Sequence, residues 1–446
     1  MSPRITVVGT GYVGTTHAAT LAELGFRVLG LDIDEDRVAA LSAGRVPFVE
    51  PGLDELVARH VATGALRFTT SYREAAAFGD VHFLCVPTPE AADGRAELKP
   101  LVGAVEELAP LLTRPVLLVG KSTVPVGTAA DLAKRLTDLT GHPGVELAWN
   151  PEFLREGTAV ADSLRPDRLV FGVSSPAATA ALREVYRVQL AAGVPAVVTD
   201  PATAELVKLS ANTFLATKIS FINAVSEVCE AVGADVGAVA AALGHDPRIG
   251  GAHLRPGLGF GGGCLPKDLR SFRAQAVDFG LTDTATLLGV VDLINNRARQ
   301  RLVDLVRAEC GGELRGRRVA ALGAAFKPDS DDVRDSPALA AAVALHREGA
   351  VVTVHDPAAG PTARRAEPRL RHADTVVDAC RDADVVVHLT EWRDYGELDP
   401  AALAEVVRGR VLVDARTTLD PAPWQEAGWR LRALGRPGPE QREGES

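Results

Sequence analysis

The fold is decided by residues 4–32, which read RITVVGTGYVGTTHAATLAELGFRVLGLD. An apolar run at residues 4–8 predicts a short strand, and the pattern G-x-G-x-x-G follows it directly at residues 9–14. A helical pattern comes next, and a second apolar run, residues 27–31, ends at Asp32. This order of strand, glycine turn, helix, strand and acid is the order that a dinucleotide-binding site requires.

Each part of this stretch has a role in binding NAD. The glycines allow a tight turn and a close approach of the pyrophosphate, and the following helix directs backbone N–H groups at the phosphates. Asp32 comes 18 residues after Gly14, where a carboxylate can accept both ribose hydroxyls and would repel a 2′-phosphate. A lone glycine pattern can be a simple turn, but with both strands and the acid in place the stretch predicts a site for NAD rather than NADP.

The composition limits the classes of protein to be considered. A chain of 446 residues, 46% of them hydrophobic and 24% charged, is typical of a globular protein of two or three domains. The net charge of -10 and the absence of a basic run argue against a nucleic-acid partner. No apolar run reaches the roughly 18 residues of a membrane span, and no signal-peptide core is present, so no membrane partner is expected. Five scattered cysteines without a C-x-x-C pair predict reduced thiols and a cytoplasmic location, and we expect no metal site.

Two loops and one acidic segment follow strands of the first domain. Apolar runs at 81–86 and 116–119 lead into Pro87-Thr88 and Ser122-Thr123. Ligands of an open parallel sheet bind outside the carboxyl ends of the strands, so both loops should border the nicotinamide, although Pro and Thr can merely shape turns. The segment 150–157 carries two glutamates four residues apart, which share a face if the segment is helical. The alternative for this pair is a solvated surface position.

A cysteine stands in a glycine-rich loop, residues 258–268, which read LGFGGGCLPKD. Glycines let the backbone approach a ligand closely. Cys264 precedes a helical pattern that runs from Lys267 to Phe279. The helix dipole and the Lys267 ammonium should lower the pKa of the thiol from its free value of about 8.5. The alternative is a passive cysteine in a turn.

A long helical pattern begins at residue 202 and continues to about residue 232. Lys208 and Asn212 are four residues apart in it, so they project side by side from one face. A cation beside an amide donor can stabilise a developing oxyanion. The alternative is a lysine that reaches solvent next to an asparagine that packs between helices. A further long helix is expected at 281–307.

The C-terminal part repeats the first domain in weaker form. Apolar runs at 317–322, 351–354 and 384–389 predict strands of a second sheet, but the glycine pattern is missing. This sheet should therefore bind another ligand or none, and the candidates for phosphate contacts are Lys327, Arg334 and Arg416.

We therefore predict an α/β fold of two Rossmann-like doubly wound parallel sheets joined by a long central helical segment. The expected boundaries are 1–200 for the NAD-binding domain, 201–308 for the helical segment with the cysteine loop, and 309–434 for the second sheet. Residues 435–446 are polar and are expected to be disordered.

Six motifs in this order resemble the UDP-glucose/GDP-mannose dehydrogenase family, and together they cover nearly the whole chain. They are Gly9-x-Gly11-Tyr12-Val13-Gly14, Lys121-Ser122-Thr123-Val124-Pro125, Asn150-Pro151-Glu152-Phe153, Lys208 with Asn212, Gly261-Gly262-x-Cys264-x-Pro266-Lys267-Asp268, and Phe326-Lys327-Pro328. The resemblance implies an NAD-binding domain, a helical dimer core and a C-terminal domain that holds a nucleotide sugar. It also implies a four-electron oxidation of a sugar C6 alcohol to the carboxylate with two NAD.

The resemblance implies the roles of individual residues as well. Cys264 would capture the intermediate aldehyde as a thiohemiacetal, whose oxidation gives a thioester. Lys208 and Asn212 would stabilise the oxyanions. Thr123 and Asp268 would position the hydrolytic water. Glu152 would be the acid/base of that hydrolysis.

The remaining implied contacts form two sets. The cofactor would lie against Gly9, Gly11, Tyr12, Val13, Gly14, Asp32, Arg37, Val86, Pro87, Thr88, Ser122, Thr123, Glu156, Lys267 and Arg334. The nucleotide sugar would lie against Glu152, Phe153, Leu154, Arg155, Glu156, Lys208, Asn212, Arg248, Arg255, Leu258, Gly259, Phe260, Gly261, Phe326, Lys327 and Arg416. Arg248 would reach this site from the partner subunit of a homodimer.

The sequence departs from the family pattern in places. Gly263 stands where the family commonly has Ser, and residues 254–257 resemble the GDP-mannose branch, while 212–218 and 248–250 resemble the UDP-glucose branch. We favour oxidation of UDP-glucose to UDP-glucuronate, with dTDP-glucose and GDP-mannose as alternatives. Two other classes stay open: a two-electron hydroxyacid dehydrogenase, which has no need of Cys264, and a non-catalytic nucleotide-sugar-binding protein.

Overall fold

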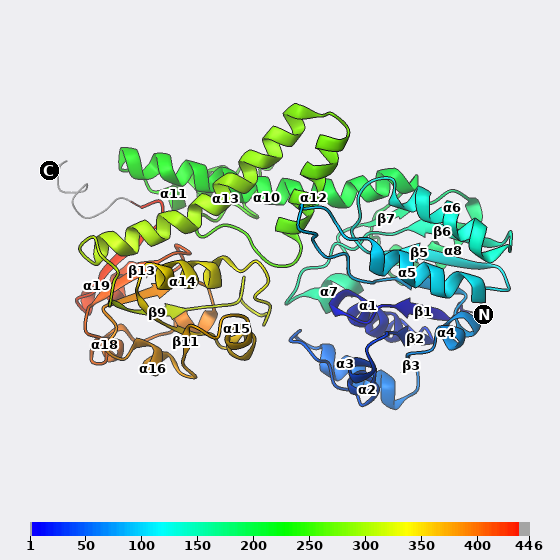
Figure 1. The fold of residues 1–446 in the computed structure, drawn as a ribbon, viewed down its shortest axis with the longest axis horizontal. Helices are drawn as coiled ribbons and strands as arrows, with labels where there is room; N and C mark the ends of the chain where they lie inside the picture. The colour runs from blue at the N-terminus through cyan, green and yellow to red at the C-terminus, as the bar shows by residue number, and fades with distance from the viewer. Residues whose placement is uncertain (1, 437–446) are drawn as a thin grey trace. The chain divides into compact units, whose positions relative to one another are not determined.

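The computed structural model describes residues 2–436, and the chain divides into two compact units, Met1–Ala211 and Asn212–Ser446. Each unit contains one sheet with helices packed against it (Figure 1). The fold predicted from the sequence, two doubly wound sheets and a long central helix, is confirmed. The domain boundaries expected at residues 200 and 308 stay a prediction.

The sheet of the first unit has the strand order β3-β2-β1-β4-β5-β6-β7-β8. Neighbouring strands are parallel, except that β6 and β7 meet in antiparallel fashion at Trp149 and Gly172. This pair is the one exception to the parallel pairing of the sheet. The strands are β1 (Ile5–Val8), β2 (Val28–Leu31), β3 (Leu66–Thr69), β4 (Val81–Leu84), β5 (Val116–Gly120), β6 (Val145–Trp149), β7 (Leu169–Gly172) and β8 (Ala196–Thr199).

Two apolar clusters cover the two faces of this sheet. Successive side chains of a strand point to opposite faces, and in β1 Val7 belongs to one cluster and Val8 to the other. Helix α1 packs on the face of Val7, and α5 and α6 pack on the face of Val8. The helices of this unit are α1 (Tyr12–Glu23), α2 (Glu35–Ser42), α3 (Leu53–Ala62), α4 (Tyr72–Phe78), α5 (Lys99–Leu108), the short 3-10 helix η1 (Ala109–Leu111), α6 (Thr128–Thr140), α7 (Ala159–Leu164), α8 (Pro176–Val185) and α9 (Arg187–Ala191).

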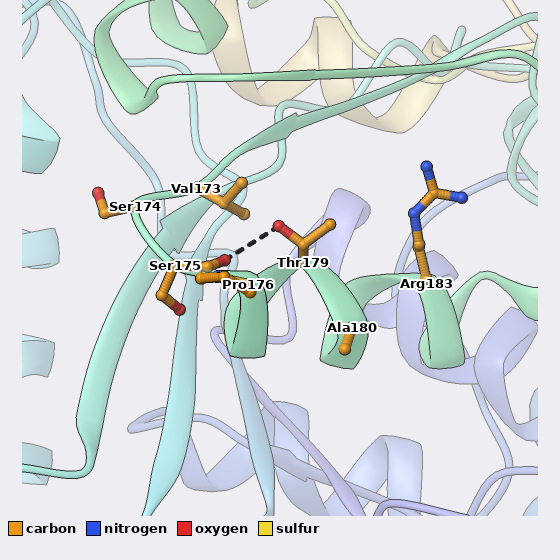
Figure 2. Close-up of a pocket in the computed structure, with 7 residues that line it drawn as sticks. All are labelled: Val173, Ser174, Ser175, Pro176, Thr179, Ala180 and Arg183. Atoms are coloured by element: carbon orange, nitrogen blue, oxygen red, sulfur yellow. Dashed lines mark hydrogen bonds between the residues drawn. The ribbon is translucent and has the colours of Figure 1, made fainter.

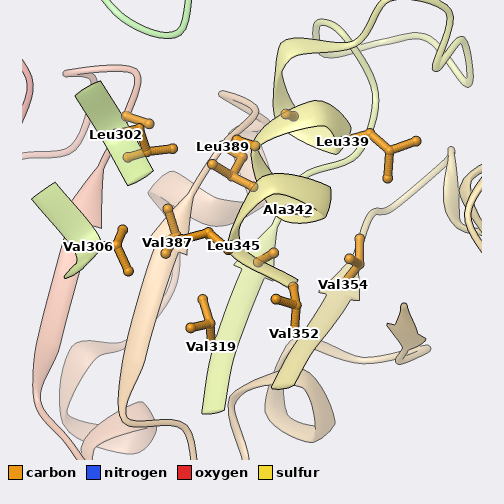
Figure 3. Packing of buried hydrophobic residues seen from close by; sticks show 14 of the residues in the cluster. Leu302, Val306, Val319, Leu339, Ala342, Leu345, Val352, Val354, Val387 and Leu389 are labelled. Atoms are coloured by element: carbon orange, nitrogen blue, oxygen red, sulfur yellow. The ribbon is translucent and has the colours of Figure 1, made fainter. Parts of the chain in front are cut away.

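The sheet of the second unit has the order β11-β10-β9-β12-β13-β14, with parallel pairing throughout. Leu302 and Val306 of α13 pack in one cluster with Val319 and Val387 of the sheet (Figure 3). The strands are β9 (Arg318–Leu322), β10 (Val351–His355), β11 (Arg371–His372), β12 (Val385–His388), β13 (Val411–Asp414) and β14 (Arg430–Ala433). The helices are α11 (Val236–Gly244), α12 (Leu265–Asp278), α13 (Thr282–Glu309), α14 (Pro337–Arg347), α15 (Gly360–Ala366), α16 (Val376–Cys380), α17 (Arg393–Gly396), α18 (Pro400–Ala404) and α19 (Pro421–Glu426).

Helix α10 (Pro201–Val232) is 32 residues long and contains the end of the first unit and the start of the second. Its bounds agree with the helical pattern predicted at 202–232. Across residues 2–436, no helix combines the length and the apolar character that a membrane crossing requires.

The expected disordered tail, 435–446, lies mostly outside the described residues. Of its first two residues, Gly435 donates its N–H to Glu230 Oε1 at 2.6 Å, and Arg436 pairs with Asp235 at 3.5 Å.

Candidate active site

The glycine turn after β1 is shaped by close contacts within the chain. Gly9 has a φ of +88°, and a Cβ there would lie 2.9 Å from the backbone of Val86. A Cβ on Gly14 would lie 1.8 Å from the carbonyl oxygen of Gly9. Gly11 differs, since a Cβ there would meet nothing within 4 Å. Gly11 is also the N-cap residue of α1, which therefore has no capping side chain. The first turn of α1 therefore offers open space for a pyrophosphate, so these residues fit NAD.

Asp32 ends β2 as a buried, hydrogen-bonded carboxylate. It accepts the Thr10 N–H at 2.7 Å and the Asp34 N–H at 3.1 Å, and it pairs with Arg37 at 3.1 Å. Burial alone would raise the pKa of Asp32, but these N–H groups and the guanidinium outweigh it and hold the pKa below its ordinary value. The side chain of Ile33 beside it is 79% exposed, a feature that the sequence analysis did not single out.

In the second sheet, the acid at the position that corresponds to Asp32 is Asp356, and it is hydrogen-bonded by its own chain. Asp356 follows β10 as Asp32 follows β2. It accepts the N–H groups of Ala324, Ala325, Ala358 and Ala359 and the indole N–H of Trp392. The five donors to this carboxylate all come from its own chain, and the glycine pattern is missing beside it.

The loops after β4 and β5 are joined to each other. The Ser122 hydroxyl donates to the Val86 carbonyl at 2.6 Å, and the Thr88 hydroxyl donates to the Thr123 carbonyl at 2.8 Å. Pro87 lies exposed between them. The structure thus brings together the residues that the sequence assigned to the nicotinamide end of the cofactor.

The segment after β6 is not helical, so the condition for a shared helix face of Glu152 and Glu156 is not met. Glu152 is also not solvated: it is 8% exposed and pairs with Lys208 Nζ at 2.9 Å. It also accepts the N–H of Leu154 at 2.9 Å. The Lys208 ammonium lies 5.5 Å from the centre of the Phe153 ring. The alternative of a lysine that reaches solvent is therefore wrong as well.

Arg155 points away from this buried pair. Its guanidinium is exposed and pairs with Asp162 at 2.6 Å. Glu156 is half-buried.

Two buried residues that the sequence analysis did not assign hold these segments. Glu50 accepts the N–H groups of Gly157 at 2.6 Å and Ala159 at 2.7 Å, and the hydroxyl of Tyr12 donates to the same carboxylate. Lys121 donates to Asn150 Oδ1 at 3.0 Å, and its burial lowers its pKa to about 8. Glu50 thereby links the glycine turn to the loop that carries Glu156. Lys121 links the loop that carries Thr123 to the loop that carries Glu152.

Cys264 is the N-cap residue of α12, as the sequence predicted, and its side chain is exposed. In the first turn of that helix, Asp268 is 1% exposed and accepts the Asn212 side-chain N–H at 2.6 Å. The Lys267 ammonium, which the sequence analysis placed beside the thiolate, pairs with Asp268 at 2.7 Å. Asn212 and Lys267 thus meet at Asp268, four residues after the cysteine.

The glycine loop before Cys264 is packed against the segment 326–335. Gly262 donates its N–H to the Arg334 carbonyl at 3.0 Å. A Cβ would lie 2.4 Å from the Asp335 carbonyl if placed on Gly261, and 2.6 Å from Arg334 Cζ if placed on Gly263. The close approach that the sequence analysis reserved for a ligand is made here by the chain itself. The Arg334 guanidinium occupies the position where a serine at 263 would place its side chain.

A cavity of about 430 Å³ lies in the second unit and contains several of the predicted substrate contacts. Arg416 donates to the Leu389 carbonyl at 2.6 Å and pairs with Glu391 at 3.1 Å. The cavity is lined by Ile219, Gly251, Ala252, His253, Arg255, Pro256, Gly257, Gly259, Glu391, Arg416 and Thr418.

The other predicted substrate residues do not line this cavity. The side chains of Leu258 and Phe260 are buried in apolar clusters. Lys327 places its ammonium 5.5 Å from the centre of the Phe326 ring.

A second hollow, of about 530 Å³ and in the first unit, contains none of the predicted site residues (Figure 2). It lies at the start of α8, where the Thr179 hydroxyl donates to the Ser175 carbonyl at 3.0 Å. Its lining residues are Val173, Ser174, Ser175, Pro176, Thr179, Ala180 and Arg183.

Models of three consecutive domains of one family match the chain. The NAD binding domain of the UDP-glucose/GDP-mannose dehydrogenase family matches residues 3–190, its central domain residues 202–297 and its UDP binding domain residues 320–421. The chain belongs to the UDP-glucose/GDP-mannose dehydrogenase family. It is an NAD-dependent nucleotide-sugar dehydrogenase, as the sequence motifs predicted.

Individual relatives of this dehydrogenase match over nearly its whole length. A UDP-glucose 6-dehydrogenase of Rhizobium meliloti is 40% identical over 97% of this chain and 100% of its own. A UDP-glucose 6-dehydrogenase of Haloferax volcanii is 41% identical over 92% of this chain and 96% of its own. The solved structure of a UDP-glucose dehydrogenase from Pyrobaculum islandicum superposes with a TM-score of 0.91 at 37% identity and covers 98% of both chains.

Proposed function

We propose that this dehydrogenase oxidises the C6 hydroxyl of UDP-glucose to the carboxylate, with two NAD per sugar and a covalent intermediate on Cys264. The observation that carries the proposal is the place of this cysteine. Of the five cysteines, all within the described residues, Cys264 is exposed and the other four are buried. Burial raises the pKa of Cys85 and of Cys380 to about 12, so these two stay protonated thiols at neutral pH. Cys264 stands at a helix N-terminus, where the dipole favours a thiolate.

In the proposed reaction, NAD held at the glycine turn of residues 9–14 and at Asp32 would supply the hydride acceptor for each of two oxidations at C6. The first oxidation gives the aldehyde, to which the Cys264 thiolate adds, so that a C–S bond forms and the carbonyl oxygen becomes an alkoxide. The second oxidation converts this thiohemiacetal to a thioester. Water then breaks the C–S bond, which releases the carboxylic acid and returns the thiol.

Lys208 and Asn212 are proposed to stabilise the oxyanions of these steps. They are one helical turn apart on α10, and each is held by a carboxylate: Lys208 by Glu152 and Asn212 by Asp268. A buried ammonium and an amide donor that are fixed before the reaction need little reorganisation when the negative charge develops.

The hydrolytic water is proposed to be positioned by Thr123 and Asp268, with Glu152 as the acid/base. Glu152 is well placed to exchange a proton, because its pairing with Lys208 keeps it in a buried polar group.

The base of the nucleotide is proposed to be uracil, because the two UDP-glucose 6-dehydrogenases named above are 40% and 41% identical to this chain. The experiment is to count the NADH formed per sugar with limiting UDP-glucose, dTDP-glucose and GDP-mannose, each with excess NAD. About two NADH from UDP-glucose is the expected result. Two from another sugar would reassign the base, and one would mean a two-electron dehydrogenase. None would mean that the substrate is a different nucleotide sugar.

We further propose that the enzyme is a homodimer whose helices α10 and α13 form the interface. On α10, Phe214, Phe221 and Val228 recur every seven residues, which places them on one stripe of the helix, and they are 65%, 54% and 61% exposed. On α13, Leu287 and Leu293 are 59% and 65% exposed. An apolar surface of this extent favours a protein partner.

Arg248 is proposed to reach the substrate of the neighbouring subunit. Its side chain is 87% exposed, and its guanidinium pairs with Asp246 at 2.6 Å.

A further inference from the structure

Helix α10 carries a buried carboxylate, Glu205, that the proposed reaction does not use. It lies three residues before Lys208, and the residue is 1% exposed. Its two oxygens accept different backbone N–H groups: Oε2 accepts that of Gly127 at 2.7 Å, and Oε1 accepts that of Ala129 at 2.6 Å. These N–H groups belong to the start of α6, far away in the sequence.

The start of α6 needs a partner of this kind. Its N-cap is Gly127, which has a φ of +102° and no side chain to cap the helix. The first N–H groups of a helix have no acceptor within the helix, and a negative charge there is favoured by the helix dipole. Glu205 thus supplies the missing cap from another helix.

The same contact fixes the loop that carries Thr123. This loop, residues 121–127, is held at its start by Lys121, which donates to Asn150, and at its end by Glu205. Asn150 lies two residues before Glu152, and Glu152 pairs with Lys208, which is on the same helix as Glu205. The contacts therefore close a ring through the first unit.

We propose that Glu205 is a positioning residue for the oxidation: it fixes the turn of α10 that carries Lys208 relative to the loop that carries Thr123. The proposal rests on the proposed function for the roles of Lys208 and Thr123. With its φ of +102°, position 127 disfavours the side chains that usually cap a helix, so the cap has to come from another element. A carboxylate from α10 links the loop to the helix that carries the ammonium.

Burying the ionised carboxylate of Glu205 costs free energy. Burial raises the pKa of Glu205 to about 7, although the N–H groups of Gly127 and Ala129 act in the opposite direction. Asp131 and Asp200, the charged groups that face it from α6 and from the residue before α10, raise the pKa further. The ionised form accepts both N–H groups, whereas the protonated form carries a hydrogen on one oxygen and holds α6 less firmly.

The test compares Glu205→Gln with the wild-type enzyme. The glutamine keeps the shape of the side chain, but its NH₂ group cannot accept an N–H, so one of the two contacts is lost. We expect kcat with UDP-glucose to fall at least about tenfold, with the KM values for NAD and UDP-glucose within about twofold of wild type. The rise of kcat with pH that belongs to an ionisation near 7 should disappear, because glutamine does not titrate.

A matched control separates positioning from helix capping. Ser175 caps α8 in the same unit by accepting the Ala178 N–H at 3.0 Å, and Ser175→Ala removes that cap. Ser175→Ala should lower the melting temperature by as much as Glu205→Gln does, with kcat unchanged. Hydrogen exchange at residues 127–129 should be faster in Glu205→Gln alone, and this readout needs no turnover.

A wild-type enzyme that forms two NADH per UDP-glucose, with Glu205→Gln equally fast, would overturn the positioning role alone. A wild-type enzyme that forms no NADH from any of the three sugars would overturn the proposed function and this role together. If Glu205→Gln does not fold, Glu205→Asp serves instead. It keeps the charge but is one methylene shorter, and a kcat equal to wild type in that variant would also overturn the proposal.

Discussion

The buried pair of Lys208 and Glu152 gives the sharpest prediction. Replacing Lys208 by methionine keeps the volume of the side chain but removes the ammonium. Glu152 then retains the Leu154 N–H as a donor while it loses its counter-charge. Both side chains are almost completely buried, so water cannot take the place of the lysine without opening the site.

The magnitude follows from the geometry. At 2.9 Å and an effective dielectric constant of about 20, the attraction between the two charges is about 6 kcal/mol. Part of this attraction only offsets the desolvation of the charges, and breaking one side of a buried pair usually costs about 3–5 kcal/mol. We therefore expect Lys208→Met to lower the free energy of unfolding of the first unit by about 3 kcal/mol. The double variant Lys208→Met/Glu152→Gln, which leaves no unpaired charge, should recover most of that loss.

The assay is denaturation by guanidinium, combined with hydrogen exchange of β5 and β6 to follow the first unit. Lys134→Met is the matched control, because Lys134 and Asp131 form a pair at 3.7 Å with both side chains 80% exposed, and no measurable change is expected there. Turnover should fall by about 10²–10³ in both the single and the double variant, since the proposed oxyanion donor is lost in each. A double variant no more stable than the single one would refute the reasoning about an uncompensated buried charge.

Three further predictions address the thiol, a buried lysine and the subunit contact. Cys264→Ser should bind NAD and UDP-glucose but form no acid, as measured by NADH per sugar; normal acid production would remove the thioester from the mechanism. The pKa of Lys121 is lowered to about 8. Between about pH 8 and 10.5 the unfolded chain therefore binds more protons than the folded chain. This group should make the first unit more stable by about 3 kcal/mol as the pH rises through that range. Lys121→Met should abolish this rise in pH-dependent unfolding, and an unchanged profile would show that the ammonium is solvated. Phe221→Glu should convert the proposed dimer to a monomer in light scattering after size exclusion; a mass equal to wild type would place the interface elsewhere.

The sequence predicts well what is decided over short distances along the chain. The strand, glycine turn, helix and acid of residues 4–32 were predictable because each part follows the one before it. The N-cap position of Cys264 was predictable for the same reason, since Pro266 and the helical pattern follow within a few residues.

Contacts between distant residues escaped prediction. For Glu152 the sequence left a helix face or a solvated surface position open, but its partner Lys208 lies 56 residues later in the chain. Glu205 and Gly127 are 78 residues apart. The glycines before Cys264 suggested a ligand, yet the segment around Arg334 fills the space beside them. Periodicity and local spacing carry no information on such partners.

The attachment of the cysteine loop bears on the order of events in turnover. Gly262 and Gly263 fasten this loop to the segment 326–335, so the thiol belongs to the same unit as the cavity of Arg255 and Arg416. The turn that fits NAD belongs to the other unit. Under the proposed mechanism, the half-oxidised sugar is bonded to a unit that does not carry the cofactor turn. Spent NADH can then be exchanged for fresh NAD between the two oxidations while the reactive aldehyde stays attached to the enzyme.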